Sequence, residues 1–285
     1  MNSPDRLFLF CPNAPEKWLK SCAKALAAEK IERIGPLGHR LLGVRTDGDI
    51  ASALKSGAPA KFDWVLVPGD RRIGDYRLLV LDMDGTLIKN ECIDELAGLL
   101  PNPGPIREMT SAAMRGTMPV EESLRKRVAA LGGLQQNSIK RVLDNKISIR
   151  PGAERLMRMA RTAGWQIILL TGGFSQFAQP VAKRLGIQHV LCNQLDIANG
   201  KLAGTFTGVL VDGPSKAQVV AALADKMGIA PKQVVALGDG ANDLETLSAA
   251  GLSIGIEPKP LIAEIVDAQL WHTPLDAVWH IAGGN

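Results

Sequence analysis

The sequence predicts an α/β protein whose main domain is a doubly wound parallel sheet, with an inserted helical cap and a small α/β domain before it. From residue 78 onward, short apolar runs alternate with amphipathic helical segments. This pattern is typical of a parallel sheet with helices on both faces. Residues 91–147 interrupt the alternation because they are helical almost throughout. We therefore predict an N-terminal domain over residues 1–75 and a main domain over residues 76–285.

The N-terminal domain is predicted to combine strands and helices. The expected elements are strands at 7–10, 41–44 and 64–67 and helices at 16–30 and 49–55. Apolar residues near helical spacing support the longer helix. Asp47 and Asp49 are candidate caps of the shorter one. Residues 68–77 are polar and begin with Pro68 and Gly69, so we interpret them as a linker.

The main domain contains the predicted parallel sheet. Its expected elements are strands at 78–81, 167–170, 234–237 and 252–256 and helices at 153–163, 176–185 and 216–227. In open parallel sheets, ligands bind at the carboxyl ends of the strands. A helical block that follows the first strand is expected to lie over that edge, so we interpret residues 91–147 as a lid.

The composition excludes several classes of protein. The chain has 285 residues, of which 46% are hydrophobic and 22% charged, as in ordinary globular proteins. The net charge is +4, and the basic residues are dispersed rather than clustered, so no nucleic-acid partner is indicated. The four cysteines form no CxxC pair, which favours reduced thiols in a cytoplasmic protein. No apolar stretch approaches the roughly 20 residues of a membrane helix.

Two carboxylates directly follow the first predicted strand of the main domain. Asp82 and Asp84 are one residue apart and precede Gly85 and Thr86. Two such anions repel each other without a cation, and they can serve as nucleophile, metal ligand and general acid. The alternative is a simple Asp-Gly turn, and the segments after the other strands argue against it.

The second predicted strand is followed by Thr171, Gly172 and Gly173. A hydroxyl beside two unhindered backbone amides suits phosphate oxygens, although the same residues also suit a plain loop. Lys216 lies at the start of a predicted helix, where the helix dipole disfavours a cation. A phosphate group beside this lysine would remove the objection.

The third predicted strand is followed by a glycine-rich acidic turn. Asp239, Asn242 and Asp243 lie within five residues, and their oxygen atoms fit a hard cation such as Mg²⁺. The alternative is that Asn242 or Asp243 caps the next helix.

These four segments, in this order, resemble those of the haloacid dehalogenase superfamily of phosphohydrolases over about residues 78–270. A closer resemblance, to the phosphoserine phosphatase family, includes segments of the predicted lid. The similar segments are 82–95, 113–116, 123–128, 171–174 and 238–243. The resemblance implies a Rossmann-like core and hydrolysis of O-phospho-L-serine to serine and phosphate, a step of serine biosynthesis.

The resemblance also implies the roles of the site residues. Asp82 attacks phosphorus and forms an aspartyl-phosphate, while Asp84 protonates the departing oxygen and later activates water. The implied Mg²⁺ ligands are Asp82, Asp84 through its backbone carbonyl, and Asp239, supported by Asp243. The implied phosphate contacts are Thr171, Gly172, Lys216 and Asn242. Such a set matches a transition state that spreads negative charge over the phosphoryl oxygens.

The lid is expected to select the substrate. By resemblance, Glu91 takes the ammonium group of phosphoserine, and Arg125 takes its carboxylate in a two-pronged contact. Met114 and the region of Val120 are expected to form an apolar wall that excludes water.

Departures from the family pattern at Gly85 and at residues 118–120 leave the substrate open, whereas the departure at Thr171 keeps a hydroxyl. The family usually has serine at the positions of Gly85 and Thr171, and residues 117–120 replace a segment that usually ends in an aromatic residue. The changes at Gly85 and at residues 118–120 motivate an alternative in which another small phosphomonoester, such as homoserine phosphate, is hydrolysed or donates its phosphoryl group. A non-catalytic regulator is disfavoured because a binding module needs no nucleophile.

The N-terminal domain stands where longer family members carry ACT-like modules that bind amino acids. A regulatory role and a dimerising or packing role both remain open, and a homodimer is compatible with the sequence.

Overall fold

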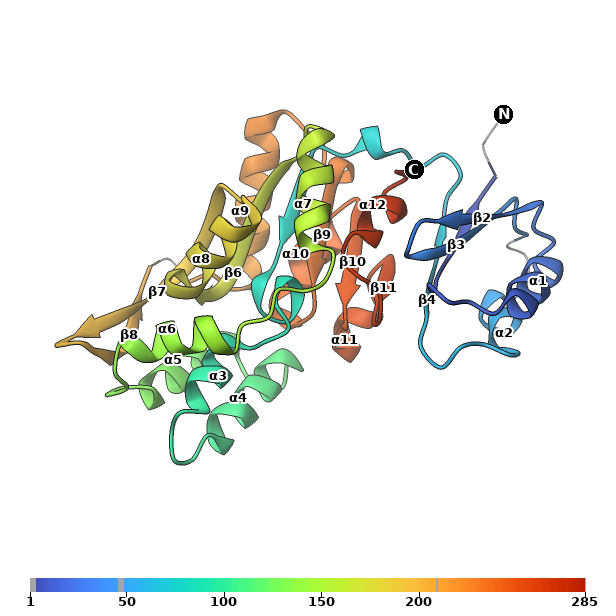
Figure 1. Cartoon of the computed structure of the whole chain (residues 1–285). Helices are drawn as coiled ribbons and strands as arrows, with labels where there is room; N and C mark the ends of the chain where they lie inside the picture. The colour runs from blue at the N-terminus through green and yellow to red at the C-terminus, as the bar shows by residue number, and fades with distance from the viewer. Residues whose placement is uncertain (1–3, 46–48, 209, 285) are drawn as a thin grey trace.

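The computed structural model describes residues 4–45, 49–208 and 210–284, so Asp47, one of the two candidate caps, lies outside the described residues. Over these ranges the strands form a four-stranded sheet of order β2-β3-β1-β4 and a seven-stranded sheet of order β11-β10-β9-β5-β6-β7-β8. Figure 1 shows the small sheet and its helices at one side of the larger, helix-covered sheet.

The small sheet is antiparallel and belongs to the N-terminal part of the chain. Its elements are β1 (Arg6–Phe10), α1 (Glu16–Ala25), β2 (Lys30–Ile34), β3 (Gly38–Leu42), α2 (Ile50–Lys55) and β4 (Asp63–Val67). Asp49 caps α2, because its side chain accepts a hydrogen bond from the backbone amide of Ser52 at 3.0 Å. The prediction of a helix to residue 30 was wrong, since α1 ends at Ala25 and Lys30 begins the unpredicted edge strand β2. Whether this domain is ACT-like stays a prediction.

Strand β1 buries both of its faces. Leu7 and Leu9 pack in one cluster with residues of α1, including Trp18. Phe8 and Phe10 point to the opposite face, as the two-residue period of a strand requires, and belong to the core cluster of the main domain. The small sheet is therefore held to the main domain by shared apolar packing.

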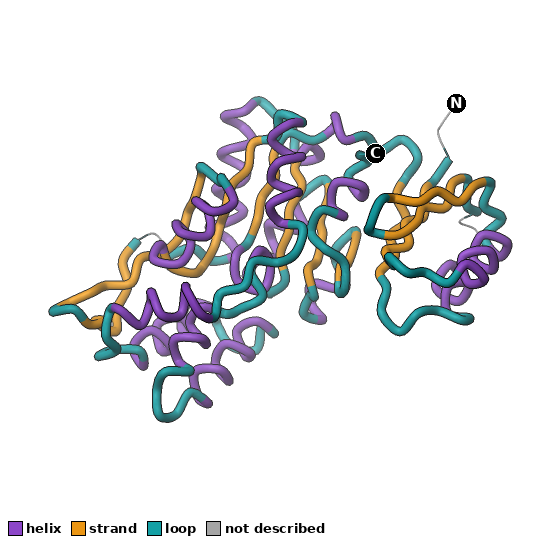
Figure 2. The backbone as a smooth tube through the Cα atoms, viewed as in Figure 1, coloured by secondary structure: helices purple, strands orange, loops and turns teal. Residues whose placement is uncertain are grey.

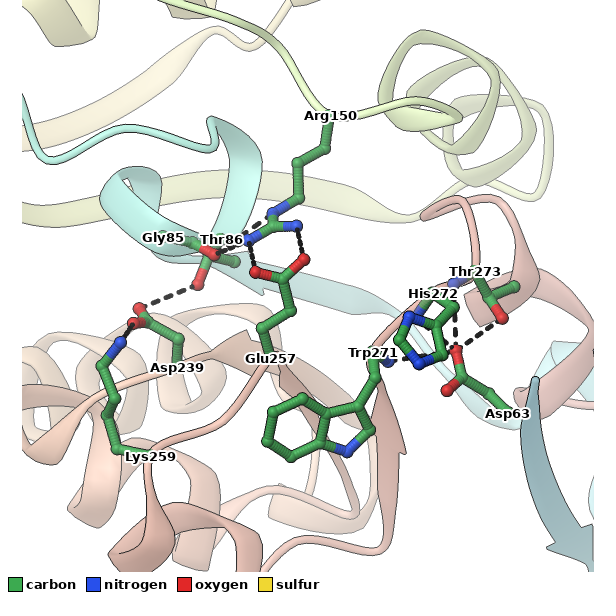
Figure 3. A network of polar contacts seen from close by, with 10 residues as sticks. All are labelled: Asp63, Gly85, Thr86, Arg150, Asp239, Glu257, Lys259, Trp271, His272 and Thr273. Carbon is green, nitrogen blue, oxygen red and sulfur yellow. Dashed lines mark hydrogen bonds and ion pairs between the residues drawn. The ribbon is translucent and has the colours of Figure 1, made fainter. Parts of the chain in front are cut away.

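A single carboxylate adds a polar anchor between the two parts. Asp63 in β4 accepts hydrogen bonds from the backbone amides of Trp271, His272 and Thr273 at 3.0, 2.8 and 2.9 Å. It also accepts one from the Thr273 hydroxyl at 2.6 Å (Figure 3). Asp63 is buried, so the C-terminal loop and β4 are tied together away from bulk solvent.

The seven-stranded sheet confirms the predicted doubly wound architecture. Its strands are β5 (Leu78–Leu81), β6 (Gln166–Phe174), β7 (His189–Ala198), β8 (Lys201–Thr207), β9 (Val234–Gly238), β10 (Leu252–Ile256) and β11 (Ala268–Leu270). The helices around it are α7 (Ala153–Thr162), α8 (Ser175–Leu185), α9 (Gly213–Met227), α10 (Leu244–Ala249), α11 (Pro260–Ala263) and α12 (Ala277–Ile281). All neighbouring strands pair in parallel except β7 with β8. All four residues of β5 are buried, as expected where helices cover both faces.

The inserted segment is helical, as its sequence predicts, and forms four helices. They are α3 (Cys92–Ala97), α4 (Gly104–Met114), α5 (Val120–Ala130) and α6 (Asn137–Asn145). Figure 2 shows this group of helices at one end of the large sheet. The segments that enter and leave the cap lie side by side, because Ile88 and Ile149 form an antiparallel β-bridge. Within the described residues, no helix is both long enough and apolar enough to cross a membrane.

Candidate active site

A cavity lies at the carboxyl ends of β5, β6 and β9, beneath the cap. Seven residues expected from the sequence contribute to its wall: Asp82, Asp84, Glu91, Thr171, Gly172, Asp239 and Asn242. The cap supplies Val120 and Leu124 to the same wall. Residues that are far apart in the sequence thus meet at one edge of the sheet, because parallel strands end at the same side.

Lys216 lies behind the cavity and holds two of the carboxylates. Its ammonium group is 2.6 Å from Asp82 Oδ1 and 2.8 Å from Asp243 Oδ1. Burial favours the neutral amine, but Asp243 and Asp82 outweigh it and raise the pKa of Lys216 above its ordinary value. The lysine therefore stays charged, and carboxylates offset the unfavourable helix dipole that its position at the start of α9 implies.

Three carboxylates form a group that fits a metal ion. Ligand oxygens of Asp82, Asp239 and Asp243 lie within 4.8 Å of one another, and all three residues are buried. Burial and the charge of Asp243 raise the pKa of Asp239 to about 7, and the same causes raise the pKa of Asp82. A cation would relieve this repulsion, and an all-oxygen donor set suits Mg²⁺. The buried Asn242 Oδ1 beside the cavity has no hydrogen-bond partner among the described residues.

Asp84 is held apart from this group by Cys92. One carboxylate oxygen of Asp84 accepts a hydrogen bond from the Cys92 backbone amide at 3.2 Å, and the other accepts one from the thiol at 3.1 Å. Burial raises the pKa of Asp84 to about 6, although the bonds from Cys92 oppose the shift. A carboxyl group with such a pKa can give and take a proton near neutral pH. The Asp84 side chain can therefore exchange a proton, and it is not one of the three carboxylates that group together for a metal ion.

Thr171 and Gly172 lie near the carboxyl end of β6, where the pairing of β6 with β7 shifts register. Thr171 is buried, and its hydroxyl accepts a hydrogen bond from the Gly173 amide at 2.9 Å. The Gly172 carbonyl accepts one from the Asn193 side chain at 2.8 Å. Asn193 is fully buried on β7, and the sequence contains no signal that would single it out.

The cap brings an acidic and a basic side chain into the cavity, Glu91 and Arg127. Burial and the nearby Asp84 raise the pKa of Glu91 well above its usual range. Arg127 donates a hydrogen bond to the Thr110 hydroxyl at 3.1 Å, and that hydroxyl donates to Asp94 at 2.6 Å. Helices α3, α4 and α5 therefore all help to orient the arginine.

The structure does not bring Arg125, the arginine favoured by the sequence, into this cavity. Its side chain is 59% exposed and pairs with Glu121 at 2.7 Å. Its guanidinium lies over the ring of Phe206, 5.3 Å from the centroid. Side chains two positions apart in a helix are separated by about 200° around the helix axis. Arg125 and Arg127 therefore lie on nearly opposite sides of α5 and cannot face the same cavity. The side chain of Met114 lies outside the described part of the structure.

Comparisons with known proteins identify the family. The model of haloacid dehalogenase-like hydrolases matches residues 79–248. The phosphoserine phosphatase of Albidiferax ferrireducens is 38% identical over 210 residues, covering 72% of this chain and 89% of its own. Phosphoserine phosphatase SerB2 of Mycobacterium tuberculosis is 40% identical over 207 residues, 73% of this chain. The match covers 50% of SerB2, so this chain spans about half the length of that relative.

Solved structures show the same relationship. A substrate-bound phosphoserine phosphatase complex has a TM-score of 0.67 and 30% identity, covering 72% of this chain and 97% of that one. A haloacid dehalogenase family hydrolase, t0658 of Salmonella enterica serovar Typhi, has a TM-score of 0.85 over 99% of both chains. Its identity of 21% makes this a likeness of fold alone. The chain therefore belongs to the haloacid dehalogenase-like hydrolases, among relatives that are named phosphoserine phosphatases.

Proposed function

We propose that this phosphatase is a Mg²⁺-dependent phosphoserine phosphatase. One observation carries the choice of substrate: an acidic and a basic side chain, Glu91 and Arg127, line the cavity that also contains Asp82 and Asp84. A phosphorylated amino acid has an ammonium and a carboxylate beyond its phosphate, and the two cap residues complement these groups. The proposed activity is the final step of serine synthesis, for which the cytoplasm is the expected compartment.

The reaction proceeds in two steps. In the first, an Asp82 oxygen forms a bond to phosphorus while the serine oxygen departs and takes a proton from Asp84. In the second, Asp84 accepts a proton from water, whose oxygen displaces Asp82 and releases phosphate. Lys216 favours the ionised form of Asp82, because its ammonium group lies 2.6 Å from the attacking carboxylate.

Asp82, Asp239 and Asp243, together with the Asp84 carbonyl, are the proposed Mg²⁺ ligands. The cation supplies charge neutralisation, which lets an anionic nucleophile approach an anionic phosphate. Thr171 and the amide of Gly172 are the proposed donors to the phosphoryl oxygens, whose charge rises in the transition state.

Arg127 replaces Arg125 as the proposed partner of the substrate carboxylate. Arg127 is buried and already oriented by Thr110, so little side-chain entropy is lost on binding. Glu91 is the proposed partner of the ammonium group, and a cation beside it would restore the ionised form that burial disfavours.

A panel of phosphomonoesters tests the proposal. We expect kcat/KM for O-phospho-L-serine to exceed that for phosphothreonine, homoserine phosphate and p-nitrophenyl phosphate, and we expect chelation of Mg²⁺ to abolish turnover. Asp82→Asn should remove activity on every ester. If homoserine phosphate is the best substrate, the reaction stands and the assignment of phosphoserine is wrong. If Asp82→Asn turns over normally, the mechanism is wrong.

A further inference from the structure

Arg150 lies where the chain returns from the cap to the main domain. Its backbone amide donates to the Leu87 carbonyl at 2.9 Å, and the preceding residue, Ile149, bridges to Ile88. Its side chain is only 9% exposed. A long cation with so little exposure needs several partners, because burial of an unpaired charge is costly.

The guanidinium of Arg150 joins two loops of the active site (Figure 3). Its Nε and Nη2 donate to the Gly85 carbonyl at 3.2 and 2.7 Å. Its Nη1 and Nη2 donate to Glu257 Oε1 and Oε2 at 2.7 and 3.1 Å. Gly85 directly follows Asp84, so the arginine is hydrogen-bonded to the turn that carries Asp82 and Asp84.

Glu257 connects these Arg150 contacts to the carboxylate group formed by Asp82, Asp239 and Asp243. It follows β10 and has a φ of +44°, a conformation that a glutamate adopts only where its surroundings impose it. Two residues later, the Lys259 amide donates to the Asp239 carbonyl at 2.8 Å. The Lys259 ammonium group also lies 3.8 Å from Asp239 Oδ2. Arg150 thus touches the turn of Asp84 on one side and the loop that supports Asp239 on the other.

We propose that Arg150 is a positioning residue: from the segment where the chain returns from the cap, it fixes the 82–86 turn relative to the loop that supports Asp239. The proposal rests on the proposed function. An arginine fork suits this task because its donors are planar and fixed relative to one another. In such a site, a shift of about 1 Å in a reacting group can cost about 100-fold in rate.

Kinetics of three variants test the proposal with p-nitrophenyl phosphate, which lacks the amino-acid groups. Arg150→Met should lower kcat about 100-fold and leave KM within about threefold, because Arg150 itself does not line the active-site cavity. Arg150→Lys keeps the charge without the fork and should recover only part of kcat. Glu257→Gln keeps both bonds to Gly85 and should lose less than Arg150→Met.

Arg155→Met is the matched control. Arg155 lies on α7, is half exposed and pairs with Asp276 at 3.5 Å, outside the cavity. The kcat and KM of Arg155→Met should match those of the wild type. The proposal would be overturned if Arg150→Met and Arg155→Met lost equal amounts of kcat. It would also be overturned if Arg150→Met folded and kept kcat within about threefold of the wild type.

Amide hydrogen exchange gives a readout that does not depend on turnover. Arg150→Met should accelerate exchange in residues 83–90 and leave β1 unchanged, since the bonds lost are confined to the turn. Unchanged exchange in that segment would count against the anchoring role. If the wild type hydrolyses no ester, the proposed function fails, while the exchange comparison still decides whether Arg150 anchors the turn.

Discussion

Lys216 and Asp82 form an ion pair of 2.6 Å in which both side chains are almost fully buried. Asp82 lines the cavity, and Lys216 lies behind it. Breaking a buried pair on one side leaves an unpaired charge in a poorly solvated place. The same lysine also neutralises Asp243, so its removal would leave two carboxylates without their counter-charge.

Lys216→Met should therefore impair both stability and activity. We expect a loss of about 3–5 kcal/mol in the free energy of unfolding, measured by urea denaturation without Mg²⁺. We expect kcat to fall at least about 100-fold, since a charge beside the reacting group is lost. Lys226→Met, at an exposed position of the same helix, serves as the control. A loss below about 1 kcal/mol would show that the pair contributes little to stability.

Stability without Mg²⁺ should fall as the pH rises. The folded-state pKa is about 7 for Asp239 and about 6 for Asp84, against 3.8 for the ordinary group. Between about pH 4 and 7 the folded protein thus binds more protons than the unfolded chain. The stability linked to these groups is complete below the unfolded pKa and is lost as the pH passes the folded pKa.

Urea denaturation at about pH 5 and about pH 8, with EDTA or with saturating Mg²⁺, measures this effect. With EDTA we expect a loss of a few kcal/mol, since a tenfold change in proton affinity is worth about 1.4 kcal/mol. Saturating Mg²⁺ should offset most of the loss at the higher pH. Asp239→Asn should weaken the pH dependence seen with EDTA, and an unchanged dependence in this variant would contradict the assignment.

The strand ends could be predicted from the sequence, whereas the orientation of the cap could not. Buried parallel strands are continuous apolar runs, so Asp82, Thr171 and Asp239 stand out as the polar residues that follow them. The two arginines of α5 have the same chemistry, and only the packing of the helix decides which one faces the cavity. Strand β2 was missed because it is a largely polar edge strand, paired on one side only.

Arg127 and Arg125 provide a direct test of the cap orientation. Arg127→Met should reduce kcat/KM for phosphoserine by about 100-fold or more, because the proposed charge-assisted contact to the substrate carboxylate is lost. The loss for p-nitrophenyl phosphate should be much smaller. Arg125→Met, a matched change two residues earlier at an exposed site, should affect both esters little. If Arg125→Met were the variant with the selective loss, the position of α5 over the cavity would be wrong.

Asp63 should contribute to stability without contributing to catalysis. Asp63→Ala leaves three backbone amides and a hydroxyl without their acceptor, and each buried unsatisfied group costs about 1–3 kcal/mol. Some of these donors will reach water, so we expect a net loss of about 3 kcal/mol in urea denaturation. The kcat of the folded variant should match the wild type. Asp70→Ala, at an exposed position, is the control, and equal stability of the two variants would refute the anchor.

Gly85 is required by the backbone rather than by the choice of substrate. Its φ is +69°, and a Cβ atom at this position would lie 2.5 Å from Asp239 Oδ2. A serine here would strain the turn and displace a proposed metal ligand. Gly85→Ser should therefore weaken Mg²⁺ binding, measured by titration calorimetry, and lower kcat at least about tenfold on every ester alike.

Gly200→Ser is the matched control for Gly85→Ser. Gly200 has a φ of +71° at the tip of the β7–β8 hairpin, with nothing within 4 Å of an added Cβ. The two variants share the backbone strain and differ only in the contact with Asp239. Normal Mg²⁺ affinity in Gly85→Ser, combined with a shift of preference toward phosphoserine, would instead make residue 85 a determinant of specificity. If only Gly85→Ser loses kcat, and loses it equally on all esters, Gly85 is needed for the geometry of the proposed metal ligands.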